Sequence, residues 1–185
     1  MAPVLPRHVF SVEEWEEMGR LGLFDEDARV ELIDGEIVDM TPIGARHQDC
    51  VNRLTKILVD QAGDEAVVQV QGPVRLGDRS EPQPDLALLR RTPHYATALP
   101  GPLDVLVVIE VADTSLARDR AKAALYAGAG IPECWIVDLE GDQVIAMGDP
   151  GSDGYRTERV RRAGDELSVA SVPGLRLSAA GILGL

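Results

Sequence analysis

The feature that most constrains the fold is the most apolar run of the chain, Leu103–Val111. A continuous run of Val, Ile and Leu predicts a central strand covered on both faces. A helical pattern follows from about Ser115 to Ala127, with Gly128 as its stop signal. A second buried strand is predicted immediately afterwards, at Glu133–Asp138. Strand, helix and strand in this order predict a right-handed crossover between two parallel strands.

Local signals predict the remaining elements. Ser11 begins a capping-box pattern, which predicts a helix that packs Trp15 and Met18 into the core. The turn signal Asp34-Gly35 predicts a hairpin over Val30–Met40. The other predicted elements are a helix at 44–62, strands at 66–71 and 84–89, a possible continuation of the first strand at 74–76, a loop at 91–102, short antiparallel strands at 143–147, 155–160 and 166–169 with a loop at 150–154, and a short helix from residue 178.

Composition limits the class of protein. The chain has 185 residues, of which 45% are hydrophobic, so a single domain spanning 1–185 is expected. It contains no apolar run of 18 residues and its N-terminus does not follow the signal-peptide pattern, so neither a membrane span nor secretion is predicted. Cys50 and Cys134 fit a reducing, cytoplasmic location, although one disulfide between them stays open.

The net charge of −13 argues against non-specific binding of nucleic acid, which depends on Lys and Arg contacts to phosphate. The field inside a groove can differ from the net charge, and bound divalent cations reverse the local charge. Other catalytic patterns are missing from the sequence, which has no glycine-rich phosphate loop, no GxSxG and no CxxC. The three histidines, His8, His47 and His94, do not follow zinc-site spacing.

Two carboxylates and a lysine point to phosphodiester hydrolysis. Asp85 follows Pro84 at the start of a strand, Glu110 lies near the end of the apolar run, and Lys122 lies on the helix that follows. This reaction needs hard oxygen ligands for Mg²⁺, an activated water and positive charge at the transition state. Taken alone, Asp85 fits a turn and Lys122 a solvated helix position, so the prediction depends on the combination.

These residues resemble the signature of the PD-(D/E)XK nuclease superfamily, as Pro84-Asp85 followed by Glu110-Val111-Ala112. The last position of that signature is Lys, and here it is Ala112. Lys122, on the next helix, is the candidate replacement. A longer series of segments resembles the bacterial Uma-type family of proposed restriction endonucleases over about residues 10–180, namely 30–37, 47, 83–86, 108–111, 122, 126 and 130–138.

The resemblance implies an α/β fold, with a restriction-endonuclease-like mixed sheet of about five strands flanked by helices and extra antiparallel strands. It also implies a divalent metal and DNA as substrate. We expect Asp85, Glu110 and the carbonyl of Val111 to bind Mg²⁺ or Mn²⁺. Asp85, Glu110 and Lys122 form the expected catalytic set, in which Lys122→Ala abolishes cleavage and leaves the fold and metal binding intact.

Three further residues are predicted to support this set. Glu31 is a carboxylate in an otherwise apolar strand, and His47 lies in the first turn of a helix, where an anion could bind. Both are expected to approach the metal site. Arg118 lies one turn before Lys122 on the same helix face, and its guanidinium could bind phosphate but cannot act as a base.

Other functions remain open at this point. Ala112 and the net charge of −13 both favour a catalytically silent module that keeps the nuclease fold and binds nucleic acid or protein. A structural protein that dimerises through exposed strands is a third possibility. A homodimer is expected for the nuclease, because paired nicks need two active sites and most soluble homo-oligomers are two-fold dimers. The C-terminal antiparallel strands are the predicted interface.

Overall fold

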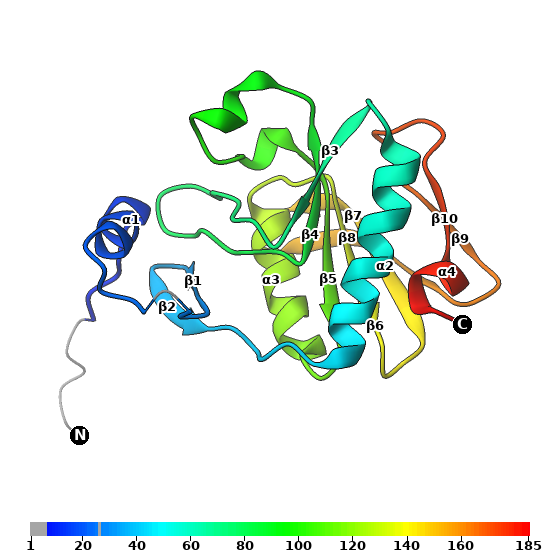
Figure 1. Cartoon of the computed structure of the whole chain (residues 1–185), viewed down its shortest axis with the longest axis horizontal. Helices are drawn as coiled ribbons and strands as arrows, with labels where there is room; N and C mark the ends of the chain where they lie inside the picture. Colours follow the sequence, from blue (N-terminus) through cyan, green and yellow to red (C-terminus); the bar gives the residue numbers. More distant parts are fainter. Residues whose placement is uncertain (1–6, 26) are drawn as a thin grey trace.

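The computed structural model describes residues 7–25 and 27–185. Residues 1–6, part of the stretch for which no signal peptide is predicted, lie outside the described residues. The centre of the molecule is a six-stranded mixed sheet with the order β3-β4-β5-β6-β7-β8 (Figure 1). Its strands are β3 (Ala66–Val70), β4 (Leu86–Arg90), β5 (Val105–Ala112), β6 (Glu133–Asp138), β7 (Gln143–Gly151) and β8 (Gly154–Arg161).

The crossover predicted from the apolar run is confirmed. Strands β5 and β6 are parallel, with Glu110 opposite Ile136, and α3 (Leu116–Gly128) connects them. All other neighbouring strands of this sheet are antiparallel. The predicted fold class, a mixed sheet flanked by helices, is therefore correct. The sheet has six strands rather than about five, because the β7–β8 hairpin continues it.

Each face of the sheet has its own cover (Figure 1). The helix α2 (Ala45–Ala62) packs on one face together with α4 (Ala179–Leu183) and the strand pair β9 (Glu166–Ser168) and β10 (Arg176–Ser178). On the opposite face lies α3. Strand β5 is buried along its whole length, and its side chains alternate between the two faces. Val107, Ile109 and Val111 face α2, and Val108 and Ala112 belong to the core under α3.

The N-terminal elements form a separate group at one end of the molecule, on the left in Figure 1. We call the helix α1 (Val12–Arg20) and the hairpin of β1 (Val30–Ile33) and β2 (Glu36–Asp39) the N-terminal lobe. The capping box at Ser11 is present. The hairpin turns through Asp34 and Gly35, whose φ angles of 50° and 77° are those of a two-residue primed turn. The predicted helix and hairpin are both confirmed.

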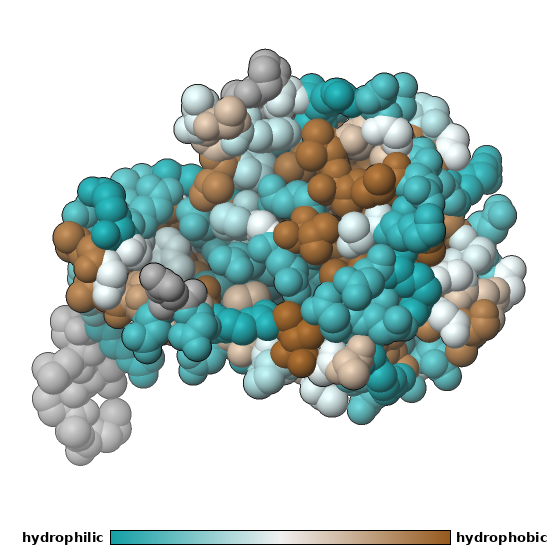
Figure 2. Space-filling view, in the orientation of Figure 1, coloured by the Kyte–Doolittle hydropathy of each residue, from teal (hydrophilic) through white to brown (hydrophobic). Residues whose placement is uncertain are grey.

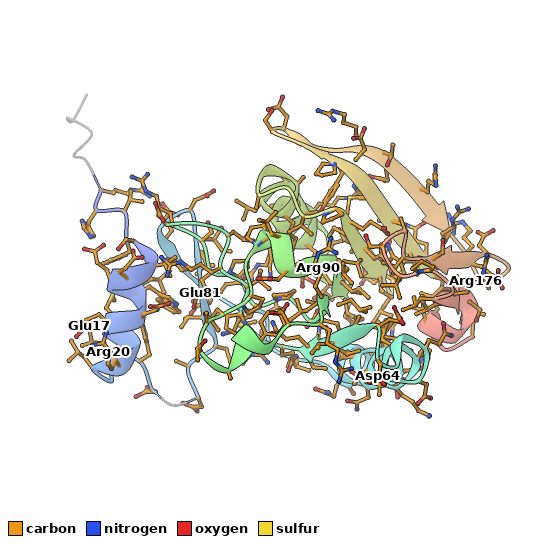
Figure 3. All side chains as sticks on the ribbon, turned by 90° about the horizontal axis from the view of Figure 1, so that it is seen from above. Glu17, Arg20, Asp64, Glu81, Arg90 and Arg176 are labelled. Atoms are coloured by element: carbon orange, nitrogen blue, oxygen red, sulfur yellow. The ribbon has the colours of Figure 1, made fainter. Side chains whose placement is uncertain are left out.

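The predicted packing of α1 is wrong. Trp15 and Met18 are only half-buried and do not join either core of the sheet. The Trp15 ring packs on Phe24 at 4.9 Å between ring centroids, and its Nε1 donates to Oε1 of Glu81 at 3.3 Å. Figure 3 shows Glu81 beside α1, which carries the labelled Glu17 and Arg20. An amphipathic helix needs some cover for its apolar face, and here the N-terminal lobe and its neighbouring loop provide it.

Other differences from the sequence predictions are local. Strand β7 runs through the predicted loop to Gly151, which pairs with Gly154 across a tight turn. Residues 74–76 form a loop instead of extending β3. Apolar side chains gather over β3 and the adjoining part of α2 (Figure 2), and these elements include the exposed Val70 and Val59. Within the described ranges, no helix is both long and apolar enough to cross a membrane.

Candidate active site

The fold brings the predicted site residues to one end of the sheet. Because β4 and β5 are antiparallel and Leu86 pairs with Ile109, Asp85 falls beside Glu110. Lys122 reaches the same place from α3. One cleft of about 200 Å³ contains these three residues together with Glu31 from β1, His47 from α2, and Arg29, Gln83, Val111, Asp113, Ser115, Arg118 and Asp119.

Lys122 lies between two buried carboxylates. Its Nζ is 3.0 Å from Oε1 of Glu110 and 3.1 Å from Oε2 of Glu31, and it also donates to the carbonyl of Gln83 at 3.4 Å. All three charged side chains are less than 10% exposed. Ala112 belongs to the core on the same side of the sheet, under α3, so Lys122 supplies a cation on the face where a lysine at the motif position would have pointed.

Asp85 is held by the backbone and by a histidine. Its Oδ2 accepts a hydrogen bond from the N–H of Val111 at 2.9 Å and lies 3.0 Å from Nε2 of His47. The N–H of Asp85 in turn approaches Oε2 of Glu110 at 3.4 Å. Both carboxylates therefore line the same cleft, and His47 fixes the orientation of Asp85 from the first turn of α2.

Glu31 connects the N-terminal lobe to this centre. Besides contacting Lys122, its Oε2 accepts a hydrogen bond from the N–H of Gln83 at 3.0 Å. Gln83 lies two residues before Asp85, so one carboxylate oxygen holds both the lysine and the segment that carries Asp85. Arg118 closes the rim of the cleft by donating to the carbonyl of Asp39 at 2.7 Å and to Oγ1 of Thr41 at 3.1 Å.

Burial and charge shift the titration of these groups. Burial raises the pKa of Glu110 to about 7, while Lys122 opposes this shift. Burial alone would lower the pKa of Lys122, but the carboxylates of Glu110 and Glu31 outweigh it and raise that pKa above its ordinary value. The hydrogen bond to Asp85 raises the pKa of His47. Lys122 in this setting is an ammonium that donates hydrogen bonds and supplies charge, and it is poorly suited to act as a base.

Comparison with known proteins decides the family. The sequence model of the Uma2 family, described as "Putative restriction endonuclease", matches residues 13–180. The chain belongs to the Uma2 family. A solved structure described as a putative nuclease belonging to DUF820, from Anabaena variabilis ATCC 29413, superposes with a TM-score of 0.76. That match covers 95% of this chain and 98% of the other, at 16% sequence identity, and it shows a shared fold. No curated protein matches.

Membership in the Uma2 family supports a nuclease, and the oxygens of the cleft fit a hard cation. Oε1 of Glu110 accepts from Tyr126 and Lys122, whereas Oε2 receives only the long contact from Asp85 within the part of the chain that the structure describes. Oδ1 of Asp85 has no hydrogen-bond partner among the described residues. The described residues contain no group of three or more His, Cys, Asp or Glu side chains placed to hold a metal. A cation here would therefore need backbone and water oxygens as well, as Mg²⁺ commonly does.

Two residues of this Uma2 site were not predicted. Tyr126, a position of the family resemblance that was assigned no role in the site, donates its hydroxyl to Oε1 of Glu110 at 2.7 Å. Asp119, which is 6% exposed, accepts a hydrogen bond from Oγ of Ser115 at 2.6 Å, and burial raises its pKa. Asp119, Lys122 and Tyr126 recur at helical spacing, so polar residues on the inward face of the α3 pattern were the available signal.

Proposed function

We propose that this chain is a Mg²⁺- or Mn²⁺-dependent endonuclease that hydrolyses phosphodiester bonds in DNA. The observation that carries the proposal is that Asp85 and Glu110 line one cleft together with the buried ammonium of Lys122. Two hard oxygen ligands next to a fixed cation suit a phosphate group and the metal that activates water against it. Membership in the Uma2 family adds independent support.

Asp85, Glu110 and the carbonyl of Val111 would hold the cation, which when bound supplies Lewis acidity and an activated water. Lys122 offers positive charge to the scissile phosphate, and Glu31 keeps it protonated and in place.

The groups around the metal ligands would act on orientation. His47 orients Asp85 through the bond to Oδ2. Arg118, exposed at the rim, suits a neighbouring phosphate, because a guanidinium matches phosphate geometry.

A catalytically silent module is the second candidate. The net charge of −13 and the alanine at position 112 favour it, because both depart from what an active nuclease needs. A homodimer and a cytoplasmic location also stay predictions.

Cleavage of supercoiled plasmid DNA tests the proposal. We expect nicking with Mn²⁺ or Mg²⁺, no nicking with EDTA, and a loss of at least about 100-fold in Asp85→Asn, since metal ligands are essential to such sites. Asp64→Asn is the matched control, because Asp64 is an exposed aspartate outside the cleft. Binding of cation and plasmid without nicking would favour the silent module.

A further inference from the structure

The two oxygens of Glu110 have different surroundings. Oε1 accepts two strong contacts, from the hydroxyl of Tyr126 at 2.7 Å and from Nζ of Lys122 at 3.0 Å. Among the described residues, Oε2 has only the 3.4 Å contact from the N–H of Asp85. The protein thus occupies one oxygen of this carboxylate and leaves the other available on the side of Asp85.

Tyr126 is buried, so its hydroxyl must find its hydrogen-bond partner within the protein. The side chain is fully buried in the core under α3, one turn after Lys122 on the same helix. A buried tyrosine hydroxyl normally needs a hydrogen-bond partner, and it has one proton to donate. The bond to Glu110 is the one that the structure gives to this hydroxyl.

Tyr155 shows what a tyrosine with a packing role does in the same core. It packs against the core under α3, and its hydroxyl donates to the backbone carbonyl of Ile131 at 2.9 Å. A backbone carbonyl satisfies a buried hydroxyl without involving any ionisable group. Packing alone therefore did not require Tyr126 to bond a carboxylate.

We propose that Tyr126 is a positioning residue that, together with Lys122, commits Oε1 of Glu110 to the protein and leaves Oε2 to bind the cation shared with Asp85. This inference rests on the proposed metal-dependent function. A carboxylate that offers one oxygen suits the octahedral shell of Mg²⁺ or Mn²⁺, whereas two-oxygen binding is typical of the larger shell of Ca²⁺. Loss of a group that holds a metal ligand in place typically weakens metal binding about 10- to 100-fold.

Calorimetric titration of Mn²⁺ into the full-length, metal-free protein tests the inference without any nucleic acid. Tyr126→Phe keeps the ring and removes the hydroxyl, and we expect it to weaken Mn²⁺ binding by about 10-fold or more. Tyr155→Phe is the matched control, with the same atom removed from the same core, and its Mn²⁺ affinity should equal that of the wild type. Thermal unfolding of both variants checks that each is folded at the temperature of the titration.

Wild-type Mn²⁺ affinity in folded Tyr126→Phe would overturn the inference. Asp85→Asn and Glu110→Gln separate its failure from that of the proposed function: if both still bind Mn²⁺ as the wild type does, the cation lies elsewhere and the proposed function fails. If both lose binding while Tyr126→Phe keeps it, only the role of Tyr126 fails.

Should Tyr126→Phe not fold, infrared spectra of the wild type with Mn²⁺ give the answer. A wide splitting between the two carboxylate stretches indicates one-oxygen binding and supports the inference. A narrow splitting indicates two-oxygen binding and overturns it.

Discussion

The two faces of the central sheet use the same strands for different purposes. Among the described residues, the buried side chains under α2 are apolar, and Leu54 and Leu58 pack there against the sheet. Under α3 the sheet and the helix bury Glu110, Lys122 and Tyr126, which are 3%, 6% and 0% exposed, against 0% for the two leucines on the other face. Side chains alternate along a strand, so neighbouring residues of β5 serve stability on one face and candidate chemistry on the other.

The difference shows how a buried charge can be tolerated. An apolar core gains stability from the area that it removes from water, whereas a buried ion loses its hydration and needs a partner. Lys122 has two carboxylate partners, and Glu110 has an ammonium and a hydroxyl. The face under α3 therefore depends on a complete network, and removal of its cation should lower the free energy of unfolding at least as much as the loss of one apolar side chain under α2.

The strongest test of this contrast is Lys122→Ala. The substitution leaves Glu31 and Glu110 buried without their shared cation, so we expect the free energy of unfolding to fall by about 3–5 kcal/mol. Urea unfolding at pH 8, above the pKa of Glu110 near 7, measures the effect. This expectation replaces the sequence-based one of an unaffected fold. A loss of only about 0–1 kcal/mol, as for an exposed ion pair, would show that water already reaches the network.

Leu58→Ala tests the apolar face. Leu58 is a fully buried residue on the inner face of α2, and its truncation should lower the free energy of unfolding by about 2–5 kcal/mol through lost burial and a cavity. The loss should be the same at pH 6 and pH 8, and Mn²⁺ affinity should not change. A weakened Mn²⁺ site in this variant would mean that the two faces are coupled and would break the comparison.

Glu81→Gln tests how a buried carboxylate affects stability when the structure gives it no ion pair among the described residues. Glu81 is buried beside α1, its Oε1 accepts only the Trp15 N–H, and its Oε2 has no partner in the described part of the chain. Burial raises its pKa, with nearby Glu16 adding to the shift and Arg75 opposing it. Ionisation of such a group weakens the folded state as the pH rises from the unfolded pKa through the folded one.

The Glu81→Gln variant should therefore gain stability relative to the wild type as the pH rises from about 4.5, where an unfolded glutamate ionises, through the raised pKa of folded Glu81, because the amide does not ionise. Urea unfolding at several pH values measures this smallest of the three effects. A difference that is flat with pH, or that shrinks as the pH rises, would show that Glu81 is solvated in the folded protein.

The sequence predicted the order of elements better than their contacts. The apolar run, the Gly128 stop signal of the helix after it and the Asp34-Gly35 turn are local features, and each predicted the correct element. Trp15 shows the limit: helical spacing predicts that one face is covered, but it does not say which part of the chain covers it. Strand β7 shows another, because pairing with β8 carried the strand through Pro150 and Gly151 despite their turn character.

For the candidate site too, the positions of residues along the chain were easier to predict than their side-chain contacts. Asp85 and Glu110 could be placed together from strand order, and Lys122 from the lack of a lysine at Ala112. The hydrogen bond of Tyr126 could not be predicted, because helical spacing places this residue on the face of Lys122 but does not say which atom its hydroxyl reaches. Only the packing of α3 on the sheet brings that hydroxyl to Oε1 of Glu110.

The two cysteines are divided between the two faces. Cys50 lies in the core under α2 and Cys134 in the core under α3, both fully buried and unpaired. Burial raises the pKa of the Cys50 thiol to about 11, and it raises the pKa of Cys134 well above its ordinary value. Thiol reagents need an accessible thiolate, so neither residue should react until the structure around it opens. The labelling rate of Cys50 would therefore report how often the apolar core under α2 opens, and that of Cys134 would report separately on the charged core under α3.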